Sequence, residues 1–206
     1  MQKLNFLKYP FHTMIHPLEG FEDIKKPQKK AFASSLIIML LFFIANNIKT
    51  LFTGFQINPN DTENFNILIS FASSVGAAVL FVICNWLITS LFDGKGRLAD
   101  VFNTVSFALL PYIFGLLAYA LLSNFVTIEE AAFVEWLMYA SMLWSGFLLI
   151  SGLCEIHEYS IFKTVISILL SVVGIVIILF LAVLVFSLVM QIEYLFSAII
   201  GEIRIR

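Results

Sequence analysis

The sequence predicts an all-α membrane protein, a bundle of five transmembrane helices with a cytoplasmic N-terminus and the C-terminus outside. Three observations support this prediction: long stretches without charge, an apolar composition and an uneven distribution of Lys and Arg. The chain has 206 residues, 60% of them hydrophobic and only 13% charged, and its mean hydropathy is +0.96. Globular domains average roughly 45 to 50% apolar and about 25% charged residues. The bilayer is therefore the expected solvent for most of the chain.

Five stretches contain no Asp, Glu, Lys, Arg or His, and each is close to the roughly 20 residues that a helix needs to cross a bilayer. They have 18, 29, 28, 19 and 29 residues and occupy 31–48, 64–92, 101–128, 136–154 and 164–192. We place the five spans at about 31–53, 65–92, 101–124, 134–154 and 164–190. Together they form one membrane domain over 31–192, which leaves little chain for a soluble domain.

The ends of the spans predict the orientation. Residues 1–30 form a basic leader with six lysines, and Lys or Arg also occurs in the loop after the second span and at Lys163. The loops after the first and third spans carry Asp and Glu without Lys or Arg. Because cytoplasmic loops are enriched in Lys and Arg, we expect the leader to lie inside. The tail, 193–206, either extends the last helix or lies in the outer interface.

The five charge-free stretches carry polar residues, whereas transporters of ions or protons usually keep an ionisable residue within their spans. The Asn and Ser side chains are expected to form hydrogen bonds between helices. Small residues at 72–78 favour close packing of the second span against another helix. Pro111 removes a main-chain hydrogen bond and predicts a kink in the third span.

The candidate chemical motifs are incomplete. His12 and His16 have a spacing that suits a metal, but no third ligand follows at a sensible distance. The segment 157–161 begins like the zinc-protease motif HExxH, with Ile161 in place of the second histidine. The glycines at 93–97 lack the spacing of a phosphate-binding loop. We therefore predict a non-enzymatic protein with no catalytic residue, cofactor or metal, and no nucleic-acid partner.

Three segments, read in order, carry a resemblance to a known family: HPLEGFEDIKKP at 16–27, DGKGRLADVFNTVSFALLPYI at 93–113 and GLCEIHEYSIFKTV at 152–165. They resemble the signature of the Yip domain family, five-span membrane proteins named for Ypt/Rab-interacting proteins. The residues that match the family pattern are, in chain order, Gly94, Gly96, Asp100, Leu110, Pro111, Gly152, His157 and Tyr159.

The resemblance implies a protein that acts by binding. The short leader is similar to that of bacterial members, so we expect a bacterial plasma membrane and a scaffold or accessory role for other integral membrane proteins, such as an ABC transporter or envelope assembly. Eukaryotic members resemble Rab-linked factors of the endoplasmic reticulum and Golgi, which is one alternative. Another is a carrier or channel for a neutral or apolar solute, with a cavity at the Pro111 kink lined by Asn85, Asn103 and Ser106. Homo-oligomerisation stays open.

The expected recognition face is cytoplasmic and is formed by 8–30, 93–100 and 154–163. Two glycines would permit a tight turn, while a histidine and a tyrosine would offer a hydrogen-bonding tip beside an aromatic ring. The residues that we assign to this face are Gly94, Gly96, Asp100, Pro111, His157 and Tyr159.

Overall fold

A computed structural model of the chain describes residues 13–14, 20–21, 29–58 and 64–205, and these ranges contain helices and no strand. Most of the predicted basic leader, 1–30, lies outside the described residues, as does Arg206. The elements are α3 (Lys29–Phe52), α4 (Ile67–Phe71), the π-helical turn η1 (Ala72–Gly76), α5 (Ala77–Leu91), α6 (Leu98–Ala108), α7 (Leu110–Leu122), the 3-10 turn η2 (Ile128–Glu130), α8 (Ala131–His157) and α9 (Ile161–Ile205).

Within the described ranges, five helical segments are long and apolar enough to cross a membrane. They are α3, the continuous run from α4 through η1 to α5, the pair α6 and α7, then α8, and finally α9. This arrangement confirms the predicted all-α architecture with five spans. A helix suits such apolar stretches because it satisfies every main-chain N–H and C=O internally, where no water is present to do so.

The second span begins at a side-chain cap, since Oδ1 of Asn66 accepts from the N–H of Leu68 at 2.9 Å. One turn of π-helix then interrupts it at the small residues Ala72–Gly76. On the side that faces α3, Ser70 donates to Oδ1 of Asn47 at 2.7 Å and Ser74 is buried. The small-residue stretch thus packs against α3 within the same chain, although part of it stays exposed.

The third span is broken at Leu109, and Pro111 is the second residue of α7. Proline has no N–H to donate, and its ring crowds the carbonyl four residues earlier, here that of Phe107. The predicted kink is confirmed. One turn after the proline, a Cβ on Gly115 would lie 1.8 Å from Oγ of Ser141 on α8. This glycine lets α7 and α8 approach closely.

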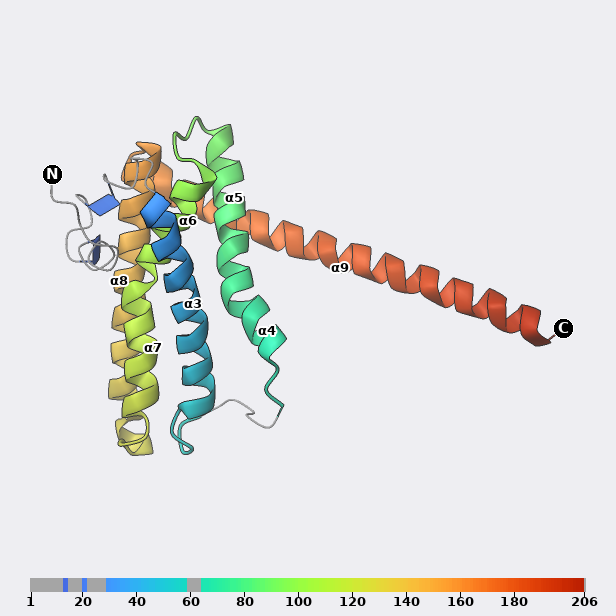
Figure 1. Cartoon of the computed structure of the whole chain (residues 1–206), viewed down its shortest axis with the longest axis horizontal. Coiled ribbons are helices and arrows are strands. Elements are labelled where there is room, and N and C mark those ends of the chain that lie inside the picture. Colours follow the sequence, from blue (N-terminus) through green and yellow to red (C-terminus); the bar gives the residue numbers. More distant parts are fainter. Residues whose placement is uncertain (1–12, 15–19, 22–28, 59–63, 206) are drawn as a thin grey trace.

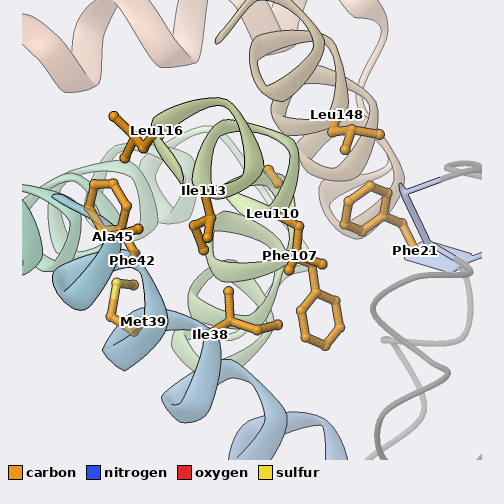
Figure 2. Close-up of a cluster of buried hydrophobic side chains, with 11 residues drawn as sticks. Phe21, Ile38, Met39, Phe42, Ala45, Phe107, Leu110, Ile113, Leu116 and Leu148 are labelled. Atoms are coloured by element: carbon orange, nitrogen blue, oxygen red, sulfur yellow. The ribbon is translucent and has the colours of Figure 1, made fainter. Parts of the chain in front are cut away.

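The main hydrophobic core lies between α3, α6, α7 and α8, and Figure 2 shows its side chains pointing toward one another. Phe21, which precedes α3, inserts its ring beside Leu148 of α8 and is fully buried. The other members are Ile38, Met39, Phe42, Ala45, Phe107, Ala108, Leu110, Ile113 and Leu116. A smaller cluster joins α5, α6 and α8 through Val82, Val101, Val105, Leu153 and Ile156.

Helix α9 leaves the bundle and extends away from the other helices (Figure 1). It contacts α5 and α8, and from Val176 to Phe196 its side chains are exposed and largely apolar. An all-round apolar surface on a helix is typical of a membrane span, where lipid tails cover it. The helix continues without interruption through 193–205. Of the two arrangements expected for this tail, an extension of the last helix or a segment in the outer interface, the structure therefore shows the extended helix.

Candidate functional site

Two connections meet at one end of the bundle. The loop from α5 to α6 covers 92–97, and the turn from α8 to α9 brings 157–163 against it. We call these two segments together the loop junction. They contain four of the six residues that the sequence assigned to a recognition face: Gly94, Gly96, His157 and Tyr159.

The turn from α8 to α9 is formed by a left-handed residue. Glu158, directly after the last helical residue, has φ 55° and ψ 41°, and its N–H still donates to the carbonyl of Cys154. The N–H of Tyr159 donates to the same carbonyl at 3.1 Å. A single left-handed residue is a common way to end a helix, although it costs a non-glycine residue about 1 to 2 kcal/mol. It turns Tyr159 back toward the end of α5.

The glycines of the loop let its main chain lie close to the side chain of His157. The left-handed residue of this loop is Asp93, with φ 59°, and no glycine among the described residues has a positive φ. A Cβ on Gly94 would lie 2.6 Å from Nδ1 of His157 and 2.8 Å from the carbonyl oxygen of Thr89, and one on Gly96 would lie 2.8 Å from Cε1 of His157. The expectation that the glycines allow a tight turn is therefore corrected: they let the main chain lie against an imidazole ring.

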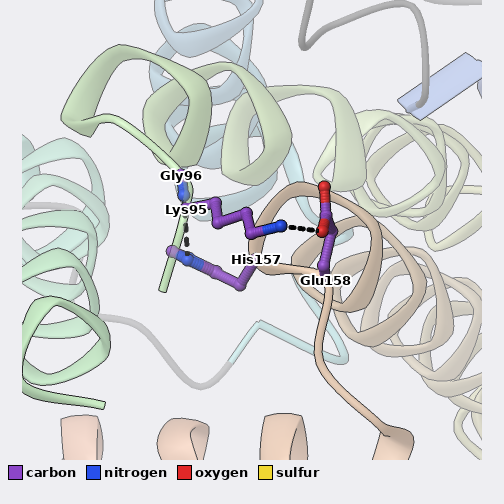
Figure 3. A network of polar contacts seen from close by, with 4 residues as sticks. All are labelled: Lys95, Gly96, His157 and Glu158. Carbon is purple, nitrogen blue, oxygen red and sulfur yellow. Dashed lines mark hydrogen bonds and ion pairs between the residues drawn. The ribbon is translucent and has the colours of Figure 1, made fainter. Parts of the chain in front are cut away.

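The second correction concerns His157, which the sequence placed at a hydrogen-bonding tip. It is only 2% exposed, because the loop covers one part of its ring and Tyr159 stacks on it, with centroids 5.4 Å apart and planes at 26°. Nδ1 accepts from the N–H of Gly96 at 3.3 Å (Figure 3). An accepting Nδ1 requires the neutral ring with its proton on Nε2. Among the described residues, Nε2 has no hydrogen-bond partner.

Tyr159 joins both ends of the loop junction. Its hydroxyl donates to the carbonyl of Phe92 at 2.7 Å and lies 3.1 Å from the carbonyl oxygen of Thr89. Burial, with the Asp93 carboxylate as a second cause, raises the pKa of this hydroxyl, so it stays a donor at neutral pH. Lys163 strengthens the contact, since Nζ donates to the same Phe92 carbonyl at 2.9 Å and lies 4.0 Å from the centre of the Tyr159 ring.

The outer edge of the loop junction is an ion pair between Lys95 and Glu158, whose side chains are 67% and 47% exposed (Figure 3). Exposed pairs of this kind contribute roughly 0.2 to 1 kcal/mol, because water screens them and both side chains lose freedom. The pair orients two charges on the surface, while the buried hydrogen bonds beneath it hold the loop.

The remaining two assigned residues lie apart from this cluster. Oδ2 of Asp100 accepts from the N–H of Arg97 at 3.0 Å, so this carboxylate caps the start of α6 beside the loop junction. Pro111 is buried in the bundle at the break between α6 and α7. It lies eleven residues after Asp100, about 16 Å along a helix at 1.5 Å per residue. Its assignment to a surface is thus wrong, because the kink is an interior feature of the third span.

Some polar residues of the spans pair directly between helices, as predicted, while most Ser and Thr hydroxyls donate to carbonyls of their own helix. Asn103 on α6 accepts from Ser35 on α3 at 2.7 Å, and Nδ2 of Asn85 on α5 donates to Ser171 on α9 at 3.0 Å. Ser106 donates to the Phe102 carbonyl of its own helix. Asn85 and Asn103 therefore lie in two different helix interfaces, which corrects the expectation that these residues line one cavity at the kink.

Sequence reasoning missed Thr89, whose carbonyl accepts from the N–H of Gly94 at 2.8 Å and lies within reach of the Tyr159 hydroxyl. No pattern indicated it, because the functional atom is a main-chain oxygen. Lys163 left no helical signal either, because it lies in the first turn of α9 whereas Tyr159 precedes that helix. No group of three or more His, Cys, Asp or Glu that could hold a metal occurs among the described residues.

Comparison with known proteins bears on all of these residues. A family model, the Yip1 domain, matches residues 11–185 and so covers both segments of the loop junction. The resemblance predicted from the three sequence segments is confirmed. No curated protein and no solved structure matches the chain.

Proposed function

The chain belongs to the Yip1 domain family of membrane proteins, and from that premise we propose that it is a non-enzymatic scaffold or accessory factor that binds other integral membrane proteins through its loop junction. The observation that carries this proposal is a surface loop tied down from beneath by a buried histidine. The buried contacts hold the exposed residues in one arrangement. A surface that is ordered in advance loses less conformational entropy when a partner binds.

The exposed part of the loop junction has the composition of a protein-binding surface. Asp93, Lys95, Arg97 and Glu158 place both signs of charge on it. Leu91 and Phe162, which are 83% and 75% exposed, flank these charges. An apolar area beside charges of both signs suits a protein partner that enters the same membrane, with apolar contact for affinity and charges for specificity. The recognition face is thus the outer surface, and His157 and Tyr159 support it from below.

We place the loop junction on the cytoplasmic side of a bacterial plasma membrane. Lys95, Arg97 and Lys163 gather at this end of the bundle, whereas the opposite end carries Glu129 and Glu130. Cytoplasmic ends are enriched in Lys and Arg, and this distribution supports the orientation.

A non-enzymatic role fits the chemistry of the buried histidine. A general base needs its accepting nitrogen close to the proton that it removes. In His157 that nitrogen, Nδ1, accepts from the N–H of Gly96. The imidazole therefore uses its accepting nitrogen to hold the loop.

The test is chemical cross-linking in native membranes, followed by affinity purification of the tagged full-length protein and identification of the cross-linked membrane proteins. A variant with Asp93→Asn and Arg97→Gln changes the charge of the exposed surface, and asparagine tolerates the left-handed conformation of Asp93. The matched control is Glu129→Gln with Glu135→Gln at the other end of the bundle. We expect a stoichiometric membrane partner with the wild-type and control proteins and its loss with the first variant. Equal capture by both variants would refute the recognition face, and wild-type protein recovered alone would refute the scaffold role.

A further inference from the structure

The contact between α5 and α9 is polar, although both helices are predominantly apolar. In the part of α9 whose side chains are described, the fully buried ones are Thr164, Ser167 and Ser171. Their spacing of three and four residues places them on one face of the helix. Ser171 on this face accepts from Asn85 of α5, Thr164 accepts from Sγ of Cys154 on α8, and the apolar side chains from Val176 onward point outward. Polar side chains of a membrane span usually face another helix that supplies hydrogen-bond partners. The partner of each of these hydroxyl groups can therefore be identified.

Three contacts fix how α5 and α9 lie side by side. Lys163 donates to the carbonyl of Phe92, and Asn85 donates to Oγ of Ser171. A Cβ on Gly174 would lie 4.0 Å from Cβ of Cys84. Over these contacts the number rises on α9 as it falls on α5, and beyond them α9 extends away from the bundle (Figure 1). Thr89 follows Asn85 by one helical turn and Ser167 precedes Ser171 by one turn, so both lie on the same side of this pair, toward the loop junction. We call these four residues the polar seam.

The polar seam has more free hydrogen-bond acceptors than donors. The hydroxyl of Ser171 donates to the carbonyl of Ser167, that of Ser167 donates to the carbonyl of Thr164, and that of Thr89 donates to the carbonyl of Asn85. Each hydroxyl thus uses its only proton on its own helix and keeps lone pairs for the space between the helices.

The side-chain amide of Asn85 adds one more acceptor that has no donor. It is 0% exposed, and its Oδ1 has no hydrogen-bond partner among the described residues. Exchanging the amide oxygen and nitrogen would not help, because the oxygen would then face Ser171 Oγ, whose proton is already donated. A buried acceptor without a donor destabilises the folded protein, because it has lost its hydrogen bonds to water. The seam therefore favours a ligand that brings protons to donate.

We propose that the polar seam is a binding site for water inside the membrane span, in which the water donates to Oδ1 of Asn85 and to a hydroxyl oxygen across the seam. The stretches 64–92 and 164–192, which hold the four seam residues, contain no Asp, Glu, Lys, Arg or His, so a neutral donor suits the seam better than a cation. Buried waters typically make about three hydrogen bonds to polar groups that otherwise lack a partner. We infer this site without using the function proposed for the loop junction.

The depth of the seam makes this proposal specific. Ser171 follows the first residue of α9 by ten positions, which is about 15 Å along the helix. On α5, Asn85 lies seven residues before Phe92, about 10 Å along that helix, so the seam extends from the loop junction into the bundle. Its upper end is the loop junction, where the Thr89 carbonyl meets Gly94 and Tyr159. Water would enter from this end.

The test measures the reaction of introduced cysteines with a small water-soluble thiol reagent in native membranes. Cys84→Ala and Cys154→Ala remove the native thiols of the full-length protein. Ser167→Cys and Thr89→Cys then probe the two walls of the seam separately, so a folding defect in one variant leaves the other informative. Ser35→Cys is the matched control, because Ser35 is equally buried but pairs directly with Oδ1 of Asn103. Val176→Cys reports on the lipid-facing side of α9.

Thiols react as thiolates, which form in contact with water, so we expect both seam cysteines to react at least about tenfold faster than the two controls. Adding Asn85→Leu removes the unpaired acceptor and should lower the rate at Ser167→Cys to that of the controls. Rates at both seam positions equal to those of the controls would overturn the proposal. An undiminished rate after Asn85→Leu would show that Asn85 does not hold the water, and would overturn it as well.

Discussion

The N–H of Gly96 donates to Nδ1 of His157 at 3.3 Å, and this one hydrogen bond joins two loops that are 61 residues apart in the chain. Around it, Tyr159 covers the ring and donates to the end of α5. The same contact explains why a glycine and a histidine occur together at this end of the bundle. The glycine allows the main chain to reach the ring, and the ring supplies the acceptor for an N–H that burial removes from water.

Gly96→Ala should destabilise the protein. The added Cβ would lie 2.8 Å from Cε1 of the buried imidazole, so the loop or the ring must move. Overpacking of this kind costs about 1 to 3 kcal/mol. Thermal unfolding in detergent micelles should show a lower midpoint. The matched control is Gly146→Ala on α8, where a Cβ would meet nothing within 4 Å. It should hold or raise the midpoint, and equal loss in both variants would contradict the close-approach role.

Tyr159→Phe should cost less than removal of the whole ring. The substitution deletes the hydroxyl that donates to the Phe92 carbonyl but keeps the stack on His157. A single hydrogen bond contributes about 0.5 to 1.5 kcal/mol. Denaturant unfolding should give a loss in this range for Tyr159→Phe and a larger loss for Tyr159→Ala. Tyr139→Phe, at an exposed position on α8, should be neutral. No difference between Tyr159→Phe and the wild-type protein would show that the hydroxyl is dispensable.

The ion pair of Lys95 and Glu158 should contribute little to stability. Both side chains are exposed, and the interaction energy from a double-mutant cycle should be below about 1 kcal/mol and fall as salt is added. The cycle uses Lys95→Gln, Glu158→Gln and the double variant, each measured by unfolding at low and high ionic strength. An interaction energy above about 2 kcal/mol that persists at high salt would mean that the pair is desolvated, in conflict with its exposure.

Gly152→Ala should disturb the packing of α6 on α8. A Cβ there would lie 2.5 Å from Cγ2 of Thr104 and 2.9 Å from the ring of Phe21. We expect a loss of about 1 to 3 kcal/mol. Thr104→Ser removes the methyl group and keeps the hydroxyl, so combining it with Gly152→Ala should restore part of the lost stability. Strict additivity of the two changes would contradict direct contact, since residues that touch are expected to couple.

Much of the fold could be predicted from the sequence. The number of spans follows from five charge-free stretches, and the break at Leu109 follows from Pro111 two residues later. The candidate site was predicted only in part. Gly94, Gly96, His157 and Tyr159 do come together, but the roles of the glycines and of His157 were wrong. A polar residue beside a loop gives no local sign of whether its side chain turns outward or inward.

The sequence by itself determined that this chain is helical and spans a membrane five times. Hydrocarbon leaves a long apolar segment no alternative to internal hydrogen bonding, and that constraint acts on each stretch separately. The tertiary structure decided which polar atoms meet: Gly96 with His157, Asn85 with Ser171 and Ser35 with Asn103. Each of these pairs joins segments more than 60 residues apart, so it depends on how the helices pack. The sequence of one segment does not show which distant residue it will contact.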